Sequence, residues 1–454
     1  MISCYGIDLR TIMPCFGAAR KGAVQVIESM RQSLIAQSYY QATAHETPSY
    51  PALAGDVSAD VVVIGGGFTG LSAALELAEA GYRVVVLEAG RVGSGASGRN
   101  GGQICTGFSP GQARLETQMS KDDAAKCFRI AEEAKQLIEA RIARHNIDCG
   151  LTWGYLHCIP KPSQFDGLQH EAEDYEKLGY PGCTVLSKAE LEAKLGSTIY
   201  HGAMREPRAG HFHALNYLHG LARAVSKAGG IIHENSNVIA LDTGPAPWAR
   251  TTQGKVTAKF MVIGGNAYLG RTVQALYGRV MPVTSYIITT EPLGEERSRA
   301  LIRDNEAVAD TNFIVDYFRR TQDNRLLFGG RASYSTLEPS DLAAYMKPRM
   351  LKVFPQLKDV RIDHAWGGYI AITSNRIPDC GRLSPNVYYA HGYSGQGVAL
   401  AQMYGKLMSD AIRGAAERFD LLARFRHLPF PGGPIRTPLL TAAMLFYRLR
   451  DALS

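Results

Sequence analysis

The sequence predicts an α/β protein in which a parallel-sheet domain is interleaved with an antiparallel-sheet domain. Residues 60–88 have the pattern of a complete strand–helix–strand unit, the repeating element of a parallel sheet. A strand, a glycine-rich turn and a helix follow near the C-terminus, over residues 387–412. Between these regions, short strand-like runs within residues 285–328 predict a second, antiparallel sheet.

Hydrophobic periodicity defines the elements in chain order. Residues 61–64 are apolar and mostly β-branched, which is typical of a buried strand, residues 71–80 favour a helix, and residues 83–87 form the next strand. Further helices are predicted at residues 121–144, 215–228, 342–354 and 397–412. Further strands are predicted at residues 231–232, 238–241, 260–263, 285–290, 312–318, 325–328 and 387–390, with short strands near Trp153 and Tyr200.

Neither predicted domain is continuous along the chain. Residues 1–55 are predicted to be an N-terminal extension that is in part disordered. The parallel-sheet domain comprises residues 56–148, 205–272 and 372–454, and the antiparallel-sheet domain comprises residues 149–204 and 273–371.

Composition is that of a folded globular protein with two or three domains. The 454 residues are 46% hydrophobic and 20% charged, which excludes a disordered chain. The 49 Lys and Arg residues exceed the 42 Asp and Glu residues by 7, but they are scattered, so nucleic acid is not an expected partner.

Cysteine spacing and apolar run lengths predict a cytoplasmic protein. The eight cysteines lie far apart and include no Cys-x-x-Cys pair, which favours reduced thiols over disulfides or a metal site. No apolar run is long enough for a transmembrane segment, and the N-terminus lacks the apolar core of a signal peptide. An apolar stretch at residues 439–445, followed by Arg448 and Arg450, could pack on the protein or lie on a membrane, and packing is favoured.

Three glycines after the first strand form a dinucleotide-binding pattern. Gly65, Gly67 and Gly70 have the spacing G-x-G-x-x-G between a strand and a helix. The first glycine permits a tight turn, the second lets backbone approach a pyrophosphate, and the third lets helix and strand pack closely. Glu88 ends the next strand, where its carboxylate can accept hydrogen bonds from ribose hydroxyls.

Two further glycine-rich segments favour FAD over NAD. Residues 94–103 can lay many backbone N–H groups along an extended cofactor. Residues 392–397 join a strand to a helix, so that their N–H groups and the helix N-terminus suit the negative edge of a reduced flavin. The alternative for both segments is an ordinary tight turn.

These motifs resemble the D-amino-acid-oxidase-like flavoprotein superfamily and, more closely, the gamma-glutamylputrescine oxidoreductase family. The resemblance covers residues 38–454 and is carried by residues 65–72, 95–103, 264–270, 323–327, 354–358, 392–398 and 429–433. The chain departs from the family at Gln396, where members commonly have histidine. It departs again at Asn375-Arg376, where the superfamily usually has Asp-Gly before a proline.

The resemblance implies an FAD-dependent oxidoreductase acting on CH–NH or CH–NH2 groups. The expected reaction is hydride transfer to flavin from gamma-glutamylputrescine or a related gamma-glutamyl polyamine, giving an imine that hydrolyses to an aldehyde. Oxygen is the expected electron acceptor, with a respiratory carrier as the alternative. The residues expected to bind FAD are Gly65, Gly67, Phe68, Thr69, Gly70, Glu88, Ala89, Ser97, Arg99, Asn100, Gly102, Gln103, Val238, Gly395, Gln396, Gly397 and Val398.

Candidates for the substrate site are His213, Arg376, Trp366 and Tyr369, and each has a structural alternative. His213, with His211, could hydrogen-bond the amine or flavin, or cap the following helix. Arg376 offers a bidentate fork for a carboxylate, or a surface ion pair, and its rivals are Arg319, Arg320 and Arg331. Trp366 and Tyr369, with Tyr317 and Tyr334, could line an apolar channel or belong to the core.

Three other functions remain compatible with the residues. The first is a D-amino-acid or sarcosine-type dehydrogenase or oxidase of the same fold. The second is a flavin-binding subunit without turnover of its own, and the third is an NAD(P)-binding module.

Overall fold

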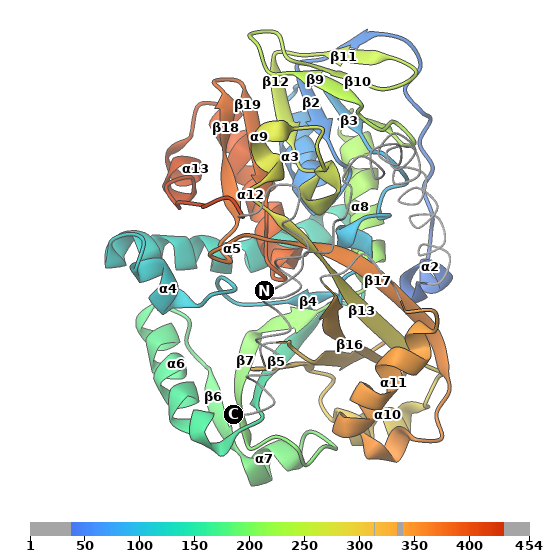
Figure 1. Ribbon diagram of the computed structural model, residues 1–454, viewed down its shortest axis with the longest axis vertical. Coiled ribbons are helices and arrows are strands. Elements are labelled where there is room, and N and C mark those ends of the chain that lie inside the picture. The colour runs from blue at the N-terminus through green and yellow to red at the C-terminus, as the bar shows by residue number, and fades with distance from the viewer. Residues whose placement is uncertain (1–37, 313, 334–338, 431–454) are drawn as a thin grey trace, which may run out of the picture.

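The computed structural model describes residues 38–312, 314–333 and 339–430, and three sheets organise this part of the chain (Figure 1). The parallel-sheet region lies at the top of Figure 1 and the large mixed sheet lies below it. The predicted fold class, a Rossmann-like domain interleaved with an antiparallel-sheet domain, is confirmed.

The parallel sheet has the strand order β18-β19-β12-β2-β3-β8. All its pairs are parallel except β18–β19. Strands β2 and β3 are buried along their whole length because helices and a second sheet cover the two faces, which explains their unbroken runs of valine, isoleucine and leucine. The bounds are β2 (Val61–Ile64), β3 (Val84–Leu87), β8 (Ile231–His233), β12 (Phe260–Ile263), β18 (Asp379–Ser384) and β19 (Val387–His391).

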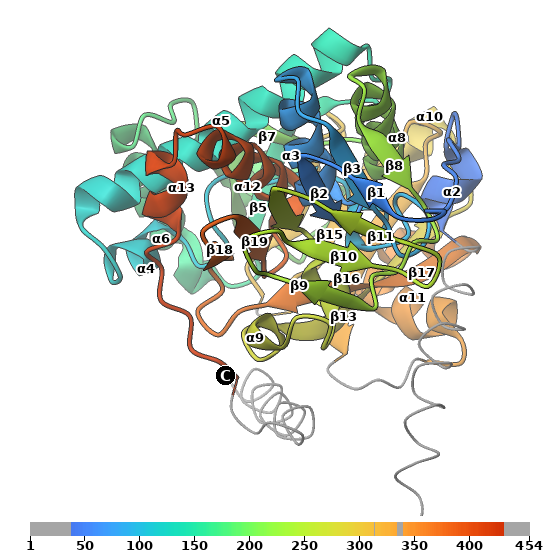
Figure 2. The same cartoon turned by 90° about the horizontal axis from the view of Figure 1, so that it is seen from above.

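Helices cover one face of this sheet, and a small sheet covers the other (Figure 2). The helices are α3 (Phe68–Glu79), α5 (Lys121–His145), α8 (Ala214–Lys227), α12 (Gly397–Ile412) and α13 (Glu417–Leu422). The small sheet has the order β1-β11-β10-β9, with β1 (Val57–Ser58), β9 (Ala240–Asp242), β10 (Trp248–Arg250) and β11 (Lys255–Thr257). Gly405 lets α12 approach α3 closely, because a methyl group there would lie 2.4 Å from the Thr69 carbonyl oxygen.

The large sheet runs β17-β13-β16-β15-β14-β5-β7-β4, with β6 beside β7. Its pairs are antiparallel apart from β5–β14. The bounds are β4 (Gln103–Ile104), β5 (Thr152–Ile159), β6 (Thr184–Ser187), β7 (Gly202–His211), β13 (Met281–Thr290), β14 (Ala307–Asp310), β15 (Tyr317–Arg320), β16 (Leu326–Ser333) and β17 (Ile362–Ile372).

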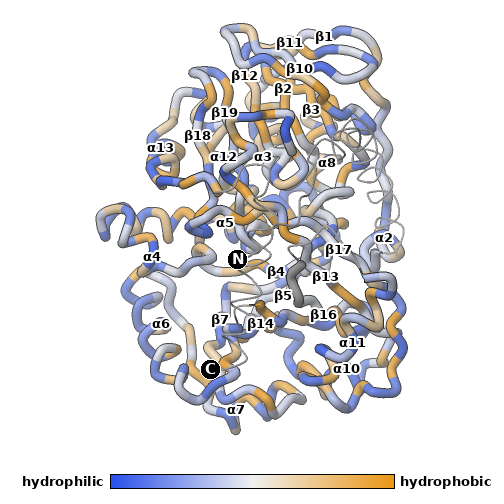
Figure 3. Tube along the Cα trace, in the orientation of Figure 1, coloured by the Kyte–Doolittle hydropathy of each residue, from blue (hydrophilic) through white to orange (hydrophobic). Residues whose placement is uncertain are grey.

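Shorter helices surround the two large sheets. They are α2 (Tyr39–Thr43), α4 (Gln112–Glu116), α6 (Phe165–Lys177), α7 (Lys188–Glu192), α9 (Gln274–Tyr277), α10 (Glu295–Leu301) and α11 (Leu342–Val353). The 3-10 helices are η2 (Ala96–Gly98), η3 (Pro162–Gln164), η4 (Asn266–Leu269) and η5 (Pro355–Leu357). Apolar residues concentrate in the central strands and helices, as Figure 3 shows, and one core cluster joins Val63 of the parallel sheet to Ile287 and Trp366 of the large sheet.

The structure corrects one predicted strand. Residues 312–318 were expected to be extended, but β15 begins only at Tyr317. The Asp310 carboxylate accepts hydrogen bonds from the backbone N–H groups of Asn312 and Asp316, which closes a turn over this segment.

The large sheet crosses the predicted domain limits. The division between residues 204 and 205 falls inside β7, and β4, in the first predicted parallel-sheet segment, pairs with β7. In the predicted extension, Tyr39 and Tyr40 are buried, whereas residues 1–37 lie outside the described part. The apolar tail at residues 439–445 also lies outside it. None of the described helices has the length and apolar character needed to cross a membrane.

Candidate functional site

A cavity of about 490 Å³ lies at the carboxyl ends of β2, β3 and β12. Open α/β sheets bind their ligands at this edge, because loops and helix N-termini meet there. Six stretches of chain contribute to its wall: residues 64–69, 87–100, 235–238, 264–272, 370–371 and 393–401. The cavity is therefore built by the parallel-sheet region together with the end of β17 from the large sheet.

The glycine motif shapes one wall of the cavity. Gly65 has a φ of 101°, a conformation that favours glycine, and a methyl group on Gly70 would lie 1.9 Å from the Gly65 carbonyl oxygen. Gly67 precedes α3 without a side-chain cap. The N-terminus of α3 therefore faces the cavity with the N–H groups and dipole that bind phosphate.

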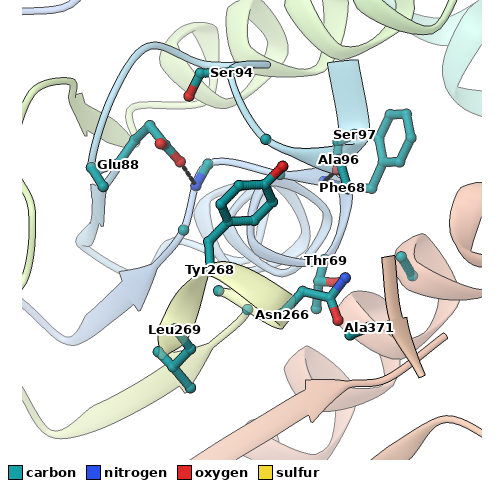
Figure 4. Close-up of a pocket in the computed structure, with 18 of the residues that line it drawn as sticks. Phe68, Thr69, Glu88, Ser94, Ala96, Ser97, Asn266, Tyr268, Leu269 and Ala371 are labelled. Carbon is teal, nitrogen blue, oxygen red and sulfur yellow. Dashed lines mark hydrogen bonds between the residues drawn. The ribbon is translucent and has the colours of Figure 1, made fainter. Parts of the chain in front are cut away.

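The Glu88 carboxylate fixes two turns beside this helix. One oxygen accepts a hydrogen bond from the Gly66 N–H at 2.8 Å, and the other accepts from the Gly90 N–H at 2.9 Å. Figure 4 shows Glu88 beside the end of α3, with its bond to the backbone as a dashed line. Each carboxylate oxygen can accept more than one hydrogen bond, so Glu88 can also accept from ribose hydroxyls.

Residues 94–103 form a second wall and reach the large sheet. Ser97 Oγ accepts a hydrogen bond from the Phe68 N–H at 2.9 Å, which ties this loop to the first turn of α3. Asn100 stabilises its own loop, because its side chain donates to the carbonyl groups of Ala96 and Ser97 and accepts from the Gly102 N–H. Both Ser97 and Asn100 also line the cavity.

Three predicted cofactor ligands in this loop region do not line the cavity. Arg99 Nε donates to the Gly367 carbonyl at 2.7 Å, and Gln103 Nε2 donates to the Val308 carbonyl at 3.0 Å. A methyl group on Gly102 would lie 2.1 Å from the Phe212 carbonyl oxygen, so this glycine allows close packing. All three residues therefore join the loop to neighbouring segments, at Gly367, Val308 and Phe212.

The turn before α12 closes the opposite end of the cavity. Gly395, Gly397 and Val398 line it, and Gly395 has a φ of 98°. Gln396 lies outside the lining, and in the described part of the chain its buried Oε1 has no hydrogen-bond partner.

Several lining residues were not among the predicted ligands. Asn266 Oδ1 accepts from the Gly392 N–H at 2.9 Å, and Tyr268 OH accepts from the Tyr369 N–H at 3.3 Å. Figure 4 places Tyr268 and Asn266 beside the helix end. The signal that could have found them is the Gly264-Gly265 pair after β12, because a neighbouring parallel strand ends at the same edge. The other unpredicted lining residues are Ile64, Gly66, Leu87, Gly90, Arg91, Gly93, Ser94, Gly95, Ala96, Asn235, Asn237, Gly264, Gly265, Leu269, Thr272, Ile370, Ala371, Tyr393, Ser394 and Ala401.

The two candidate histidines do not reach the cavity. His213 Nδ1 accepts from the Asn216 N–H at 3.1 Å and so caps α8, and its Nε2 lies 3.0 Å from Thr43 Oγ1. His211 Nε2 donates to the Asn305 carbonyl at 2.8 Å. Burial lowers the pKa of each imidazole to about 3, and the charge of Arg319 contributes. Both are therefore neutral at physiological pH.

The aromatic candidates lie behind or beside the cavity walls. Trp366 is fully buried, and its Nε1 donates to the Arg99 carbonyl at 3.0 Å. The Tyr369 ring packs edge-on against Tyr268, with centroids 5.7 Å apart. Tyr317 packs against Gly101, where a methyl group would lie 2.7 Å from its ring. Tyr334 lies outside the described residues.

The candidate arginines differ in their surroundings. Arg319 is buried and donates to the Gly101 and Phe212 carbonyls and to the Tyr40 hydroxyl. Arg320 donates to Asn324 Oδ1 and to the Ile302 carbonyl. Arg376 is half-buried in the turn after β17, with a φ of 63° and its N–H bonded to the Thr373 carbonyl. None of these three lines the cavity, and the side chain of Arg331 lies outside the described part.

The chemistry of the cavity lining fits an FAD molecule. The walls of the cavity carry three features in succession. They are the N-terminus of α3 for the phosphates, the Glu88 carboxylate for the ribose, and glycine turns that let the backbone approach the cofactor. Among the described residues, no group of three or more His, Cys, Asp and Glu could hold a metal ion.

Comparisons with known proteins agree with this geometry. The pattern of the FAD dependent oxidoreductase family, DAO, matches residues 60–411. The chain is 41% identical over 418 residues to the gamma-glutamylputrescine oxidoreductase of Escherichia coli (strain K12), covering 92% of this chain and 98% of that protein. It is 38% identical to a probable oxidoreductase, OrdL, of Haemophilus influenzae, covering 91% and 97%.

Solved structures of similar fold include two enzymes that act on amino acids. Glycine oxidase of Geobacillus kaustophilus superposes with a TM-score of 0.69 at 23% identity, covering 82% of this chain and 99% of that one. The L-amino acid deaminase of Proteus vulgaris superposes with a TM-score of 0.68 at 17% identity, covering 83% and 99%. At these identities the superpositions show the shared fold.

Proposed function

The chain belongs to the FAD-dependent oxidoreductase family, and on this premise we propose that it oxidises the primary amine of gamma-glutamylputrescine, or of a related gamma-glutamyl polyamine, to an aldehyde. One observation carries the choice of substrate. The identity of 41% to the E. coli enzyme extends over 92% of the chain, so it includes the large sheet as well as the nucleotide-binding motifs.

We assign the cavity to FAD, residue by residue. The N-terminus of α3, with Gly65, Gly67, Phe68 and Thr69, would hold the pyrophosphate. Glu88 and Ala89 would contact the adenosine ribose, and Val238 the adenine.

The remaining assignments concern the ring and its supports. The residues that would surround the flavin ring are Ser97, Asn100, Ala371, Gly395, Gly397 and Val398. Four further residues would hold in place the backbone that contacts FAD, without lining the cavity themselves. They are Gly70, Arg99, Gly102 and Gln103. When bound, FAD supplies a two-electron acceptor for the hydride that leaves the carbon next to the substrate amine.

The chain's own contribution is orientation and exclusion of water. A neutral amine releases hydride more readily than an ammonium ion, and a poorly solvated site disfavours the ammonium form. Ile287 and Trp366 are buried on the face of the large sheet that packs against the parallel-sheet domain. The substrate loses two electrons and two protons to become an imine, and water then replaces nitrogen to give the aldehyde and ammonia.

The acceptor and the compartment are part of the proposal. Oxygen is the first candidate for the electron acceptor, and a respiratory carrier is the second. A cytoplasmic location is supported by the thiols, because all six described cysteines are free.

The test is an absorbance spectrum followed by anaerobic addition of gamma-glutamylputrescine. We expect a yellow protein that bleaches with this amine and regains its colour when oxygen is admitted. If only D-amino acids or sarcosine bleach the flavin, the proposed substrate is wrong and the protein acts on those compounds. If no amine bleaches the flavin, the protein is a flavin-binding subunit without turnover. A colourless protein with nicotinamide affinity would overturn the cofactor assignment.

A further inference from the structure

Glu206 is a buried carboxylate that the flavin site does not use. It lies on β7 with 5% of its surface exposed, and its Oε2 has no hydrogen-bond partner among the described residues. Burial raises the pKa of this carboxyl, and the Thr106 hydroxyl and the charges of His157 and Lys135 oppose the rise. Burying a carboxylate oxygen without a hydrogen-bond partner destabilises the folded protein. A ligand that donates a hydrogen bond to Glu206 Oε2 would offset this cost.

A buried lysine lies beside it, already paired with another carboxylate. Lys135 of α5 donates to Glu132 Oε2 at 2.6 Å and to Thr106 Oγ1 at 2.9 Å, which uses two of its three N–H donors. Its ammonium group also lies 4.3 Å from the centroid of the Tyr180 ring. Within the described residues, Glu206 makes no ion pair within 4.0 Å, and the charge of Lys135 acts on it from farther away.

Glu206 and the flavin-side loop share one face of the large sheet. Glu206 lies opposite Tyr155, Tyr155 opposite Ala307, and Ala309 opposite Tyr317. Residues opposite one another in a sheet lie on the same face. At the other end of this row, Tyr317 packs against Gly101.

The face between these ends has small, buried side chains with half-buried residues around them. Gln103, Cys105, His157 and Tyr317 are half-buried there. Between Tyr317 and Tyr155, the side chains are those of Ala209, Ala307 and Ala309. In Figure 1, α6 lies beside β7, the strand that carries Glu206.

The length of this face is of the same order as that of the proposed substrate. Tyr317 and Glu206 lie on β15 and β7, which are three inter-strand spacings apart, or about 14 Å. From the carbon that bears the amine to the α-carbon of its glutamyl end, extended gamma-glutamylputrescine spans about eight bonds, or roughly 10 Å. With one end at the flavin, the α-ammonium and α-carboxylate groups would come to the region of Glu206 and Lys135.

We propose that Glu206 and Lys135 recognise the glutamyl end of the substrate, Glu206 binding its α-ammonium group and Lys135 its α-carboxylate. This inference rests on the proposed function and names the residues that select its substrate. The two groups carry opposite charges on one carbon atom, so a site that binds both needs one buried anion and one buried cation close together. Recognition at this end would favour gamma-glutamylated diamines over free diamines.

Three substrates test the two halves of the proposal. They are gamma-glutamylputrescine, the analogue without the α-amino group, N-(4-aminobutyl)glutaramic acid, and the analogue without the α-carboxylate, 4-amino-N-(4-aminobutyl)butanamide. In Glu206→Gln, we expect the kcat/KM preference for the first over the second to fall by at least about 30-fold, with the deaminated analogue oxidised as well as before. In Lys135→Met, the preference over the decarboxylated analogue should fall by a similar factor.

Matched variants control for position and folding. Glu139→Gln and Lys126→Met alter side chains of α5 that are more exposed, and both should keep the native preferences. Arg376→Met tests the rival carboxylate partner. If Arg376→Met loses the preference for gamma-glutamylputrescine over the decarboxylated analogue and Lys135→Met keeps this preference, the assignment of Lys135 is overturned. Glu206→Gln has nearly the same shape, so it decides the question even if Lys135→Met fails to fold.

Binding of an unreactive ligand separates this inference from the proposed reaction. Gamma-glutamylbutylamide has the same glutamyl end and no oxidisable amine, and calorimetry with the holoenzyme should show binding that Glu206→Gln weakens by at least about 30-fold. If the wild-type flavin does not bleach with gamma-glutamylputrescine, the proposed function fails. If it bleaches and Glu206→Gln retains both its preference and its affinity, the proposed role of Glu206 fails.

Discussion

The hydroxyl groups of Tyr393 and Thr69 lie 2.7 Å apart in the interior of the protein. This hydrogen bond joins the turn before α12 to the first turn of α3, although 324 residues separate the two. Both residues line the cavity. The two helix N-termini that frame the cavity are thus held in fixed relative positions.

Replacement of Tyr393 by phenylalanine should destabilise the protein modestly. The variant leaves the buried Thr69 hydroxyl without this partner, and we expect a loss of about 1 kcal/mol in the free energy of unfolding. Urea titration measures it. A double-mutant cycle with Thr69→Val isolates the bond, and additive effects of the two changes would contradict the coupling.

Replacement of Gly70 by alanine should disturb the glycine turn and release FAD. Because the new methyl group would lie 1.9 Å from the Gly65 carbonyl oxygen, backbone must move, at an expected cost of about 1–3 kcal/mol in stability. The measurement is the ratio of flavin to protein absorbance after purification. Gly167→Ala is the matched control, because no atom lies within 4 Å of its new methyl group in α6, and it should retain full flavin content.

Replacement of Glu88 by glutamine should weaken FAD binding about 10- to 100-fold. The amide would turn an N–H group toward one of the backbone donors at Gly66 and Gly90, and one charge-assisted bond would be lost. Quenching of flavin fluorescence on titration of the apoprotein reports the affinity. Glu79→Gln, at the far end of α3, should bind FAD normally, and an unchanged affinity in Glu88→Gln would argue against the ribose assignment.

His213 should make stability depend on pH between about 6.5 and 3. Burial lowers its pKa from 6.5 to about 3, so the unfolded chain takes up a proton that the folded protein does not. The contribution of His213 to the free energy of unfolding is therefore fully present above pH 6.5. It is lost as the pH falls toward 3, by up to about 1.4 kcal/mol per pH unit.

His213→Asn tests this contribution, because asparagine can also cap α8. We expect a shallower fall in urea stability between pH 6 and pH 4 than in the wild type. His170→Asn, an exposed change on α6, should leave the slope unaltered. An equal slope in His213→Asn and the wild type would show that this histidine does not titrate as inferred.

Local sequence patterns were sufficient for the nucleotide-binding half of the fold. The β2–α3–β3 unit, the Gly65-Gly67-Gly70 spacing and Glu88 lie within one stretch of about 30 residues, so that chain connectivity alone brings them together. The same reasoning located the helix that follows Gly395 and Gly397.

The directions of individual side chains could not be read in the same way. Arg99 and Asn100 are neighbours in the predicted flavin loop, yet only Asn100 lines the cavity, because Arg99 finds its acceptor at Gly367 on β17. His213 likewise takes its place as the cap of α8, and Trp366 as a core residue bonded to the Arg99 carbonyl. For Arg99 and Trp366 the deciding partner comes from a distant part of the chain, whereas His213 caps its own helix through the Asn216 N–H.

The amino-acid sequence by itself determined the fold class and the cofactor motif, because these depend on periodicity and on spacings within short segments. The family followed from the resemblance of its motifs to those of known flavoproteins. Only the tertiary structure decided that Asn266, Asn237 and Ala371 join the cavity, and that Glu206 is buried near Lys135 with one carboxylate oxygen unpaired among the described residues. The physical reason is that a buried polar group is satisfied by whatever packs against it. Which groups pack against a buried polar side chain depends on strand order and helix packing, and not on distance along the sequence.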